Sequence, residues 1–127
     1  LKLGYKYNIQ INQIYDYNGL KEIDDFSVLD VISKNTNYKK LYLDAEKINV
    51  LRENYQNDIV TNLKGTVKNR KLYFQKDIYI KLFAKDKKDL PKNGDKVLIK
   101  TGHLAEYKGT PQILIHSKND YEVIFYK

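Results

Sequence analysis

Residues 72–83 read Leu-Tyr-Phe-Gln-Lys-Asp-Ile-Tyr-Ile-Lys-Leu-Phe. Apolar residues return at every second position, which is typical of a β-strand because successive side chains point to opposite faces of a sheet. The apolar side chains that we expect to face a core are Leu72, Phe74, Ile78, Ile80 and Leu82. Those expected to face outward are Tyr73, Gln75, Tyr79, Lys81 and Phe83. The pattern fits either one bent strand or a tight pair of strands broken at Lys76-Asp77.

Outward from this stretch, the second half of the chain reads as short strands separated by turns. Asn69-Arg70 and Lys108-Gly109 are turn signals, because Asn and Gly tolerate positive φ. Gly65 and Gly102 fall inside expected strands, where Gly permits sharp coiling or close backbone approach. The further strands that we expect cover residues 59–68, 97–104, 113–115 and 121–126.

The first part of the chain predicts a hairpin and a short helix. Apolar odd positions alternate with polar even positions over residues 3–12, and Asn18-Gly19 is a type I′ turn signal before an apolar segment at 26–32. We therefore expect an antiparallel hairpin over residues 1–33. Asp44 is suited to cap a helix at about 44–56, where apolar residues recur at spacings of three and four.

Length and charge bound the class of protein. The 127 residues fit one globular domain, with residues 1–57 as a hairpin-helix extension and residues 58–127 as its core. Residues 1–57 hold 8 basic and 8 acidic side chains, whereas residues 58–127 hold 15 and 8, so the net charge of +7 belongs to the second part. This asymmetry favours a phosphate-bearing partner. A solvated lysine-rich surface without function, as AT-rich coding would give, is the alternative.

The second part also resembles a known family. The resemblance rests on Leu63, Gly65 and Val67, on the string Gly94-Asp95-x-Val97-x-Ile99 with Gly102, and on Tyr107-Lys108-Gly109-x-Pro111-Gln112-Ile113. Over about residues 58–126 the chain is similar to the OB-fold nucleic-acid-binding domain of the tRNA-anticodon-binding type. The resemblance implies a mostly β fold with an OB-type five-stranded barrel. The helix usual between the third and fourth OB strands has no counterpart in the short, charged segment 85–93, and the helix expected at 44–56 is the candidate to cap the barrel instead.

The expected binding surface is the outward face of the barrel, where cations would meet phosphates and aromatic rings would stack on bases. Its candidate residues are Lys64, Thr66, Lys68, Arg70, Tyr73, Tyr79, Lys81, Phe83, Lys100, His103, Tyr107 and Lys108. Coverage of this face by the N-terminal hairpin is the alternative. The hairpin tyrosines Tyr5, Tyr7, Tyr15 and Tyr17 are expected to pack on the barrel, or else to stack on bases or form a partner surface.

No residues predict catalysis or a bound cofactor. There is no cysteine, no Gly-x-Ser-x-Gly motif and no paired carboxylates, and His103 and His116 have no acidic residue clearly beside them, so we expect no metal. No apolar stretch is long enough to span a membrane. The sequence therefore predicts a non-catalytic domain that binds single-stranded DNA or RNA. The alternatives are a protein-interaction module docking on a larger subunit, or the targeting domain of a nuclease.

Overall fold

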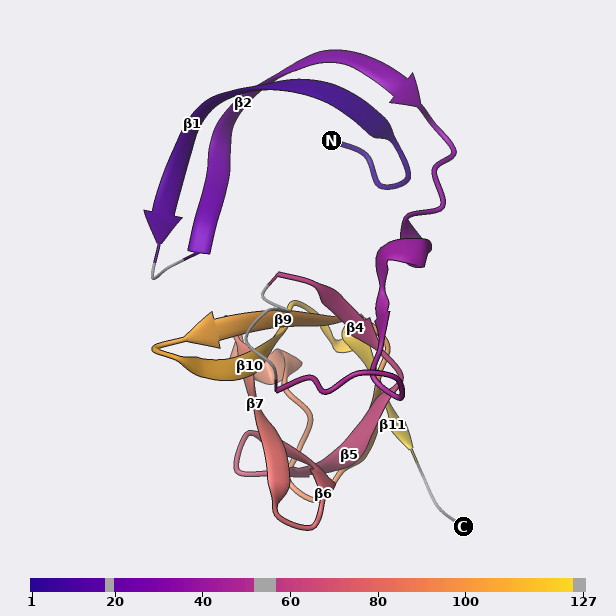
Figure 1. Cartoon of the computed structure of the whole chain (residues 1–127). Helices are drawn as coiled ribbons and strands as arrows, with labels where there is room; N and C mark the ends of the chain where they lie inside the picture. The colour runs from indigo at the N-terminus through magenta and orange to yellow at the C-terminus, as the bar shows by residue number, and fades with distance from the viewer. Residues whose placement is uncertain (18–19, 52–56, 125–127) are drawn as a thin grey trace. The chain divides into compact units, whose positions relative to one another are not determined.

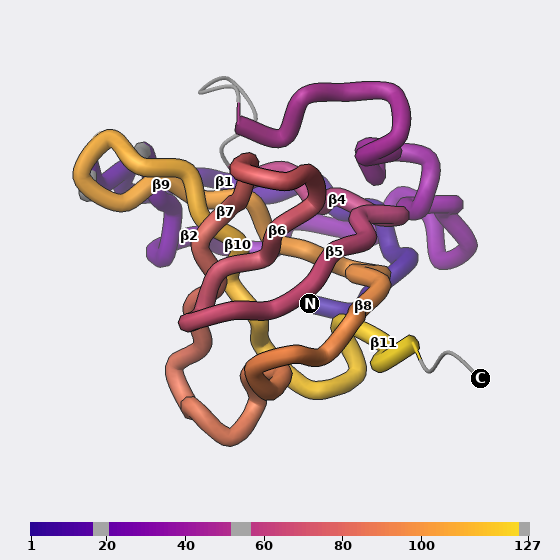
Figure 2. Tube along the Cα trace, turned by 90° about the horizontal axis from the view of Figure 1, so that it is seen from below, coloured from indigo at the N-terminus to yellow at the C-terminus, as the bar shows by residue number. Residues whose placement is uncertain are grey.

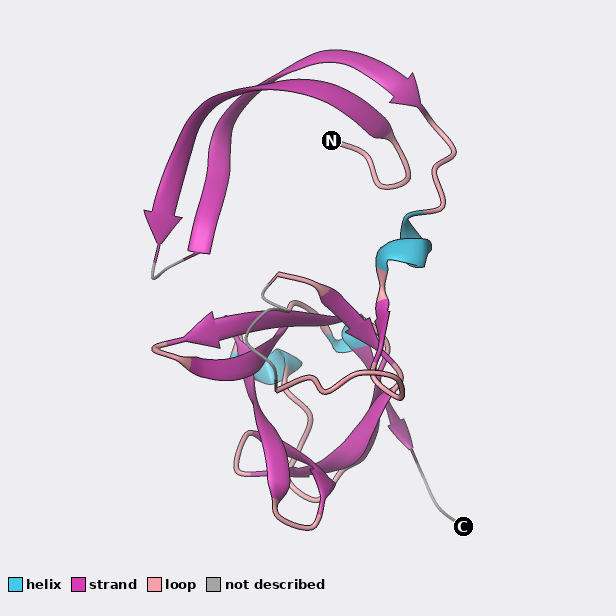
Figure 3. Ribbon diagram, viewed as in Figure 1, coloured by secondary structure: helices cyan, strands magenta, loops and turns pink. Residues whose placement is uncertain are grey.

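The computed structural model describes residues 1–17, 20–51 and 57–124, and the chain forms two compact units, Leu1–Leu41 and Tyr42–Lys127 (Figure 1). Strands dominate both units, and the helices are single short turns (Figure 3). Among the described residues, no helix is long and apolar enough to cross a membrane. The boundary expected at 57/58 falls inside the second unit.

The first unit is the predicted antiparallel hairpin. Strand β1 (Lys6–Tyr17) pairs with β2 (Leu20–Ser33), with Tyr7 opposite Val31 and Ile11 opposite Phe26, and the 3-10 turn η1 (Tyr38–Leu41) follows. The prediction of a hairpin over residues 1–33 is confirmed. The turn at Asn18-Gly19 lies outside the described residues.

The second unit is one sheet of nine strands. In chain order they are β3 (Leu43–Asp44), β4 (Ile59–Thr61), β5 (Leu63–Lys68), β6 (Lys71–Gln75), β7 (Ile78–Ala84), β8 (Lys96–Ile99), β9 (Gly102–Tyr107), β10 (Thr110–Ile115) and β11 (Tyr121–Ile124). The strand order is β11-β8-β5-β6-β7-β10-β9-β4-β3, and Figure 2 shows β5 between β8 and β6. All neighbours are antiparallel except β7 with β10 and β3 with β4.

Two stretches of chain each form two consecutive strands that pair in different parts of this sheet. Asn62, with φ of 63°, separates β4 from β5, and Lys100-Thr101 separate β8 from β9. The strand expected at 97–104 is therefore two strands that diverge at these residues. β5 pairs with β8 on one side, while β4 pairs with β9 on the other. No closed barrel is found among the described strands.

The core is formed by apolar side chains that point to one side of the alternating strands, as the sequence predicts. Val67, Leu72 and Ile80 stand side by side in register on β5, β6 and β7, with at most 1% of each side chain exposed. Residues 72–83 form a tight pair of strands rather than one bent strand. Ile78 is less buried than the alternation predicts: it lines a hollow together with Leu63 and Phe74, but 40% of the residue is exposed. The pairing of β6 with β7 shifts register between Tyr73 and Gln75, which interrupts the alternation there.

The helix expected at 44–56 is absent from its described part, residues 44–51, and residues 52–56 lie outside the described residues. Asp44 belongs to β3 instead of capping a helix, and its Oδ1 accepts a hydrogen bond from the Glu46 backbone at 3.0 Å within a turn. The Ala45 backbone N–H donates to the Thr61 carbonyl at 2.9 Å, which ties this segment to β4. Tertiary pairing overrides the helical spacing because Asn and Val add little helix propensity at 49 and 50.

Both predicted tight turns have the backbone that their sequences require. Asn69 and Arg70 have φ of 51° and 60°, and Lys108 and Gly109 have φ of 50° and 79°. Two consecutive positive φ values match the right-handed twist of the strands that each turn joins. These turns fix which residues of β5 and β6, and of β9 and β10, stand opposite each other.

Candidate functional site

The outward side chains of β5, β6 and β7 form a surface that we call the outer face. Because Val67, Leu72 and Ile80 point into the core, the residues on either side of them point outward. The members of the outer face are Lys64, Thr66, Lys68, Lys71, Tyr73, Tyr79, Lys81 and Phe83, whereas Gln75 follows the register shift and stands opposite Ile78. None of them is acidic, so the outer face carries positive charge together with aromatic rings.

Three lysines cross the outer face in one row. Lys68 stands opposite Lys71, and Lys71 stands opposite Lys81, while Gln112 of β10 continues the row beside Lys81. Among the described residues, none of these three lysines makes an ion pair. Like charges directly opposite on neighbouring strands repel each other. The row is thus a concentrated, uncompensated positive charge.

An aromatic row lies one step along the strands. Thr66 stands opposite Tyr73, and Tyr73 stands opposite Tyr79. The two tyrosine rings lie 5.1 Å apart at 45°, and the Lys71 Nζ lies 4.7 Å from the centre of the Tyr79 ring. Both tyrosines are half-buried. Cation and ring therefore lie close enough to meet a phosphate and its base together.

A third row lies on the other side of the lysines. Phe83 stands beside Leu114 of β10, which stands opposite His103 of β9. Phe83 is 54% exposed and is the most open aromatic ring of the outer face. Its ring offers a stacking platform that no neighbouring aromatic side chain occupies among the described residues.

His103 takes part in a chain of hydrogen bonds. Its Nδ1 lies 2.9 Å from Nε2 of His116, and its Nε2 lies 2.8 Å from Oδ1 of Asn57. The two imidazole rings are stacked, with centres 5.2 Å apart. Burial first, and then the charge of His116, lower the pKa of His103 below its ordinary value. His103 therefore favours the neutral form, which fits a hydrogen-bonded structural role better than phosphate binding.

The other sequence-predicted residues lie at the margins. Arg70 is in the turn between Lys68 and Lys71, and Tyr107 and Lys108 are at the tip joining β9 to β10, where the Lys108 Nζ lies 5.4 Å from the Tyr107 ring centre. These three residues extend the outer face at its turns.

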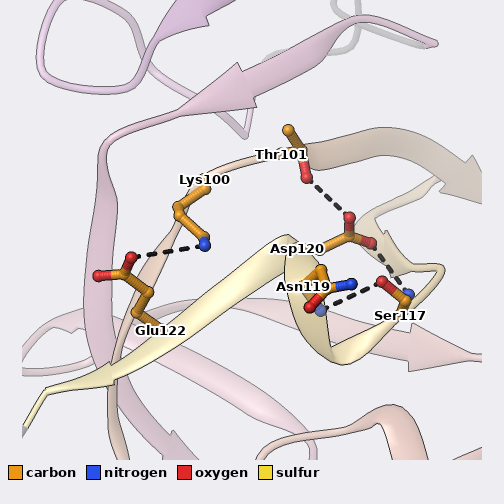
Figure 4. A network of polar contacts seen from close by, with 6 residues as sticks. All are labelled: Lys100, Thr101, Ser117, Asn119, Asp120 and Glu122. Atoms are coloured by element: carbon orange, nitrogen blue, oxygen red, sulfur yellow. Dashed lines mark hydrogen bonds and ion pairs between the residues drawn. The ribbon is translucent and has the colours of Figure 1, made fainter.

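Lys100 is a weaker candidate because it makes an ion pair with an acidic residue, and Lys64 lies two strands away from the same residue. Lys64 and Glu122 stand on either side of Leu98, and Lys100 Nζ lies 3.4 Å from the Glu122 carboxylate (Figure 4). Figure 4 also shows Asp120 accepting hydrogen bonds from Thr101 and from the Ser117 backbone, at 2.7 and 3.2 Å. This network shapes the turn η4 (Lys118–Asp120), and the ion pair with Glu122 compensates the charge of Lys100.

Lys71 is the residue that the sequence reasoning missed. It shares the odd parity of Tyr73 and directly follows the turn Asn69-Arg70, so its outward position was readable from the same alternation. The place of Gln112 in this row could not be predicted from the alternation, because only the parallel pairing of β10 with β7 brings Gln112 beside Lys81.

The described residues contain no group of three or more His, Asp or Glu side chains arranged to hold a metal ion. Comparisons of the chain with protein families, with curated proteins and with solved structures give no match.

Proposed function

We propose that the second unit is an OB-type domain that binds single-stranded nucleic acid, DNA or RNA, without catalysis. Five stretches would correspond to the OB strands, namely β4 with β5, then β6, β7, β8 with β9, and β10. Their pairing follows the OB order, including the parallel contact of the third strand with the fifth. OB domains bind oligonucleotides across strands two and three and the adjoining loops, which here are β6, β7, Arg70 and Lys108.

The observation that carries the proposal is the row of Lys68, Lys71 and Lys81. Three unpaired cations in register cost free energy in the absence of a ligand, and a polyanion relieves that repulsion. Aromatic rings lie on both sides of the row, at Tyr79 and at Phe83. A single strand running across the face would place phosphates at the lysines and bases on the rings.

The test is a titration of an oligo-pyrimidine at several salt concentrations. Wild-type protein should bind with a negative log–log salt slope, about 0.7 for each phosphate neutralised, because binding releases counterions. Replacing Lys68, Lys71 and Lys81 by Gln should weaken binding and reduce the slope by about 2.

The matched control replaces Lys34, Lys39 and Lys40 of the first unit by Gln. These lysines are exposed, and the control has the same net charge as the outer-face variant. It should bind as the wild type does. Equal affinities of both variants would show that only total charge matters, and the outer face would not be the binding site.

A protein-interaction role is the second candidate, and the first unit supports it. Its hairpin exposes large apolar side chains, among them Ile14, Leu29 and Ile32, each more than half exposed. Exposed apolar patches are typical of interaction surfaces. Salt-independent binding to oligonucleotides, or none, together with capture on a defined partner subunit, would favour this role over nucleic-acid binding.

A further inference from the structure

An open hollow lies beyond the ends of β7 and β10, outside the outer face. Its volume is about 830 Å³. The charged and titratable residues of its lining are Lys85, Asp86, Lys87, Lys88, Asp89 and His116. The first five follow β7 and include the 3-10 turn η3 (Lys87–Asp89), while His116 follows β10.

The hollow continues the row of Phe83 and Leu114. β7 and β10 run parallel, and Phe83 stands beside Leu114 with Ala84 beside Ile115 buried next to them. Lys85 and His116 come one residue later, directly after the ends of β7 and β10. At the usual strand rise, Lys85 follows Phe83 by about 7 Å, which is close to one nucleotide step of an extended strand. A single strand leaving the outer face past Phe83 would therefore reach this hollow.

Of the two acidic residues of the lining, Asp86 builds the local fold through its carboxylate and Asp89 through its backbone carbonyl. Asp86 Oδ1 accepts a hydrogen bond from the Lys88 backbone at 3.0 Å and caps η3. The charge of Asp89, after the larger effect of burial, raises the pKa of Tyr121, and the Tyr121 hydroxyl donates to the Asp89 carbonyl at 2.8 Å. Among the described residues, Lys85, Lys87 and Lys88 make no ion pair with either carboxylate or with any other. The lysines remain available to a ligand.

His116 adds an imidazole ring to the lining of the hollow. Asn57 Oδ1 can only accept, so His103 Nε2 donates to it and His103 Nδ1 accepts from His116 Nε2. His116 Nδ1 is then outside the chain of hydrogen bonds.

We propose that this hollow binds the terminal phosphate monoester of a single-stranded nucleic acid. The inference rests on the proposed function, because the strand is held by the outer face. A phosphate monoester carries roughly −1.5 to −2 charges near pH 7, whereas each phosphodiester carries about one. Three free lysines and an imidazole around one hollow discriminate in favour of the more highly charged group.

The experiment compares three oligo-thymidines of the same length, one with a 5′-phosphate, one with a 3′-phosphate and one with neither. Calorimetric titration of the wild type should give about tenfold tighter binding for one of the phosphorylated ends. Replacing Lys85, Lys87 and Lys88 by Gln should abolish this preference while the unphosphorylated oligonucleotide still binds. The His116 ring resonance should shift with the preferred oligonucleotide alone.

A second variant separates the two proposals. Replacing Lys68, Lys71 and Lys81 by Gln should weaken all three oligonucleotides and preserve the preference for the phosphorylated end. Equal affinity of the wild type for all three oligonucleotides would overturn the terminal-phosphate site and leave the outer face standing. No binding of any oligonucleotide by folded wild-type protein would overturn the outer face, and the terminal-phosphate site with it.

Discussion

Lys71 and Lys81 stand directly opposite each other on β6 and β7, and the Nζ of Lys71 lies 4.7 Å from the centre of the Tyr79 ring. The ring therefore holds one of two like charges that repel each other across the sheet. This arrangement lowers the stability of the free protein and attracts a polyanion. A substitution that removes one of the two charges should therefore raise stability and weaken binding.

Lys81→Gln should separate these two quantities. The free energy of unfolding should rise by about 0.2–1 kcal/mol, because the repulsion with Lys71 is removed, while affinity for an oligo-pyrimidine should fall. Urea denaturation and a binding titration on the same preparation measure both. Lys76→Gln, in the exposed turn between β6 and β7, is the control and should change neither. Loss of stability in Lys81→Gln would contradict the repulsive row.

The aromatic side chains should contribute to binding independently of salt. Phe83→Ala and Tyr79→Ala should each weaken oligonucleotide binding by about 1–3 kcal/mol with the salt slope unchanged, because stacking releases few ions. In thermal melts, Tyr79→Ala should lower the melting temperature more than Phe83→Ala does, because Tyr79 packs on Tyr73 and Lys71 whereas Phe83 is 54% exposed. Wild-type affinity in both variants would show that these rings are covered, and the outer face would lose its stacking platforms.

Stability should follow the observed burial along β7 rather than alternation alone. Ile80→Ala should lower the free energy of unfolding by about 2–5 kcal/mol, because it opens a cavity where Ile80 is 1% exposed. Ile78→Ala should cost about 1 kcal/mol or less, since 40% of Ile78 is exposed. Equal losses of unfolding free energy for the two variants in chemical denaturation would mean that Ile78 contributes to the core as much as Ile80 does.

Gly65 should not tolerate a side chain. A Cβ at this position would lie 2.5 Å from the Tyr73 carbonyl oxygen and 2.9 Å from Leu72 Cγ, so β5 and β6 would have to move apart. Gly65→Ala should therefore destabilise the protein by about 1–3 kcal/mol. Lys64→Ala, at the exposed neighbouring position, is the matched control for a denaturation series and should be nearly neutral. A neutral Gly65→Ala would show that the two strands are less closely paired.

Acid should weaken the fold through His103. Its pKa in the folded protein is below the ordinary value of 6.5, through burial first and His116 second, so the unfolded chain binds the proton more readily. The stabilising contribution is thus complete above about pH 6.5 and is lost as the pH falls through the folded pKa. The free energy of unfolding, measured from about pH 8 to about pH 5, should decline less in His103→Gln than in the wild type. Identical pH profiles would exclude His103 as the group responsible.

The sequence by itself determined most of the strands, the facing of most side chains and the tight turns. Alternation placed Leu72, Ile80 and Leu82 in the core and left Lys81 and Phe83 outside, because the period of two is a local property of extended backbone. The same alternation also places Lys71 on the outward side of its strand. The turns at 69–70 and 108–109 were likewise legible, since positive φ depends on the residues in the turn itself.

Only the tertiary structure decided which of these side chains meet. The helical spacing over 44–51 gave way to pairing of β3 with β4, because backbone hydrogen bonds to a distant strand outweigh a weak local propensity. The row of Lys68, Lys71 and Lys81 depends on the register between strands. The hollow beside His116 depends on the parallel pairing of β7 with β10, two strands separated by β8 and β9 in the chain. Such pairing is set by the packing of the whole core, so it cannot be predicted from the local pattern of residues.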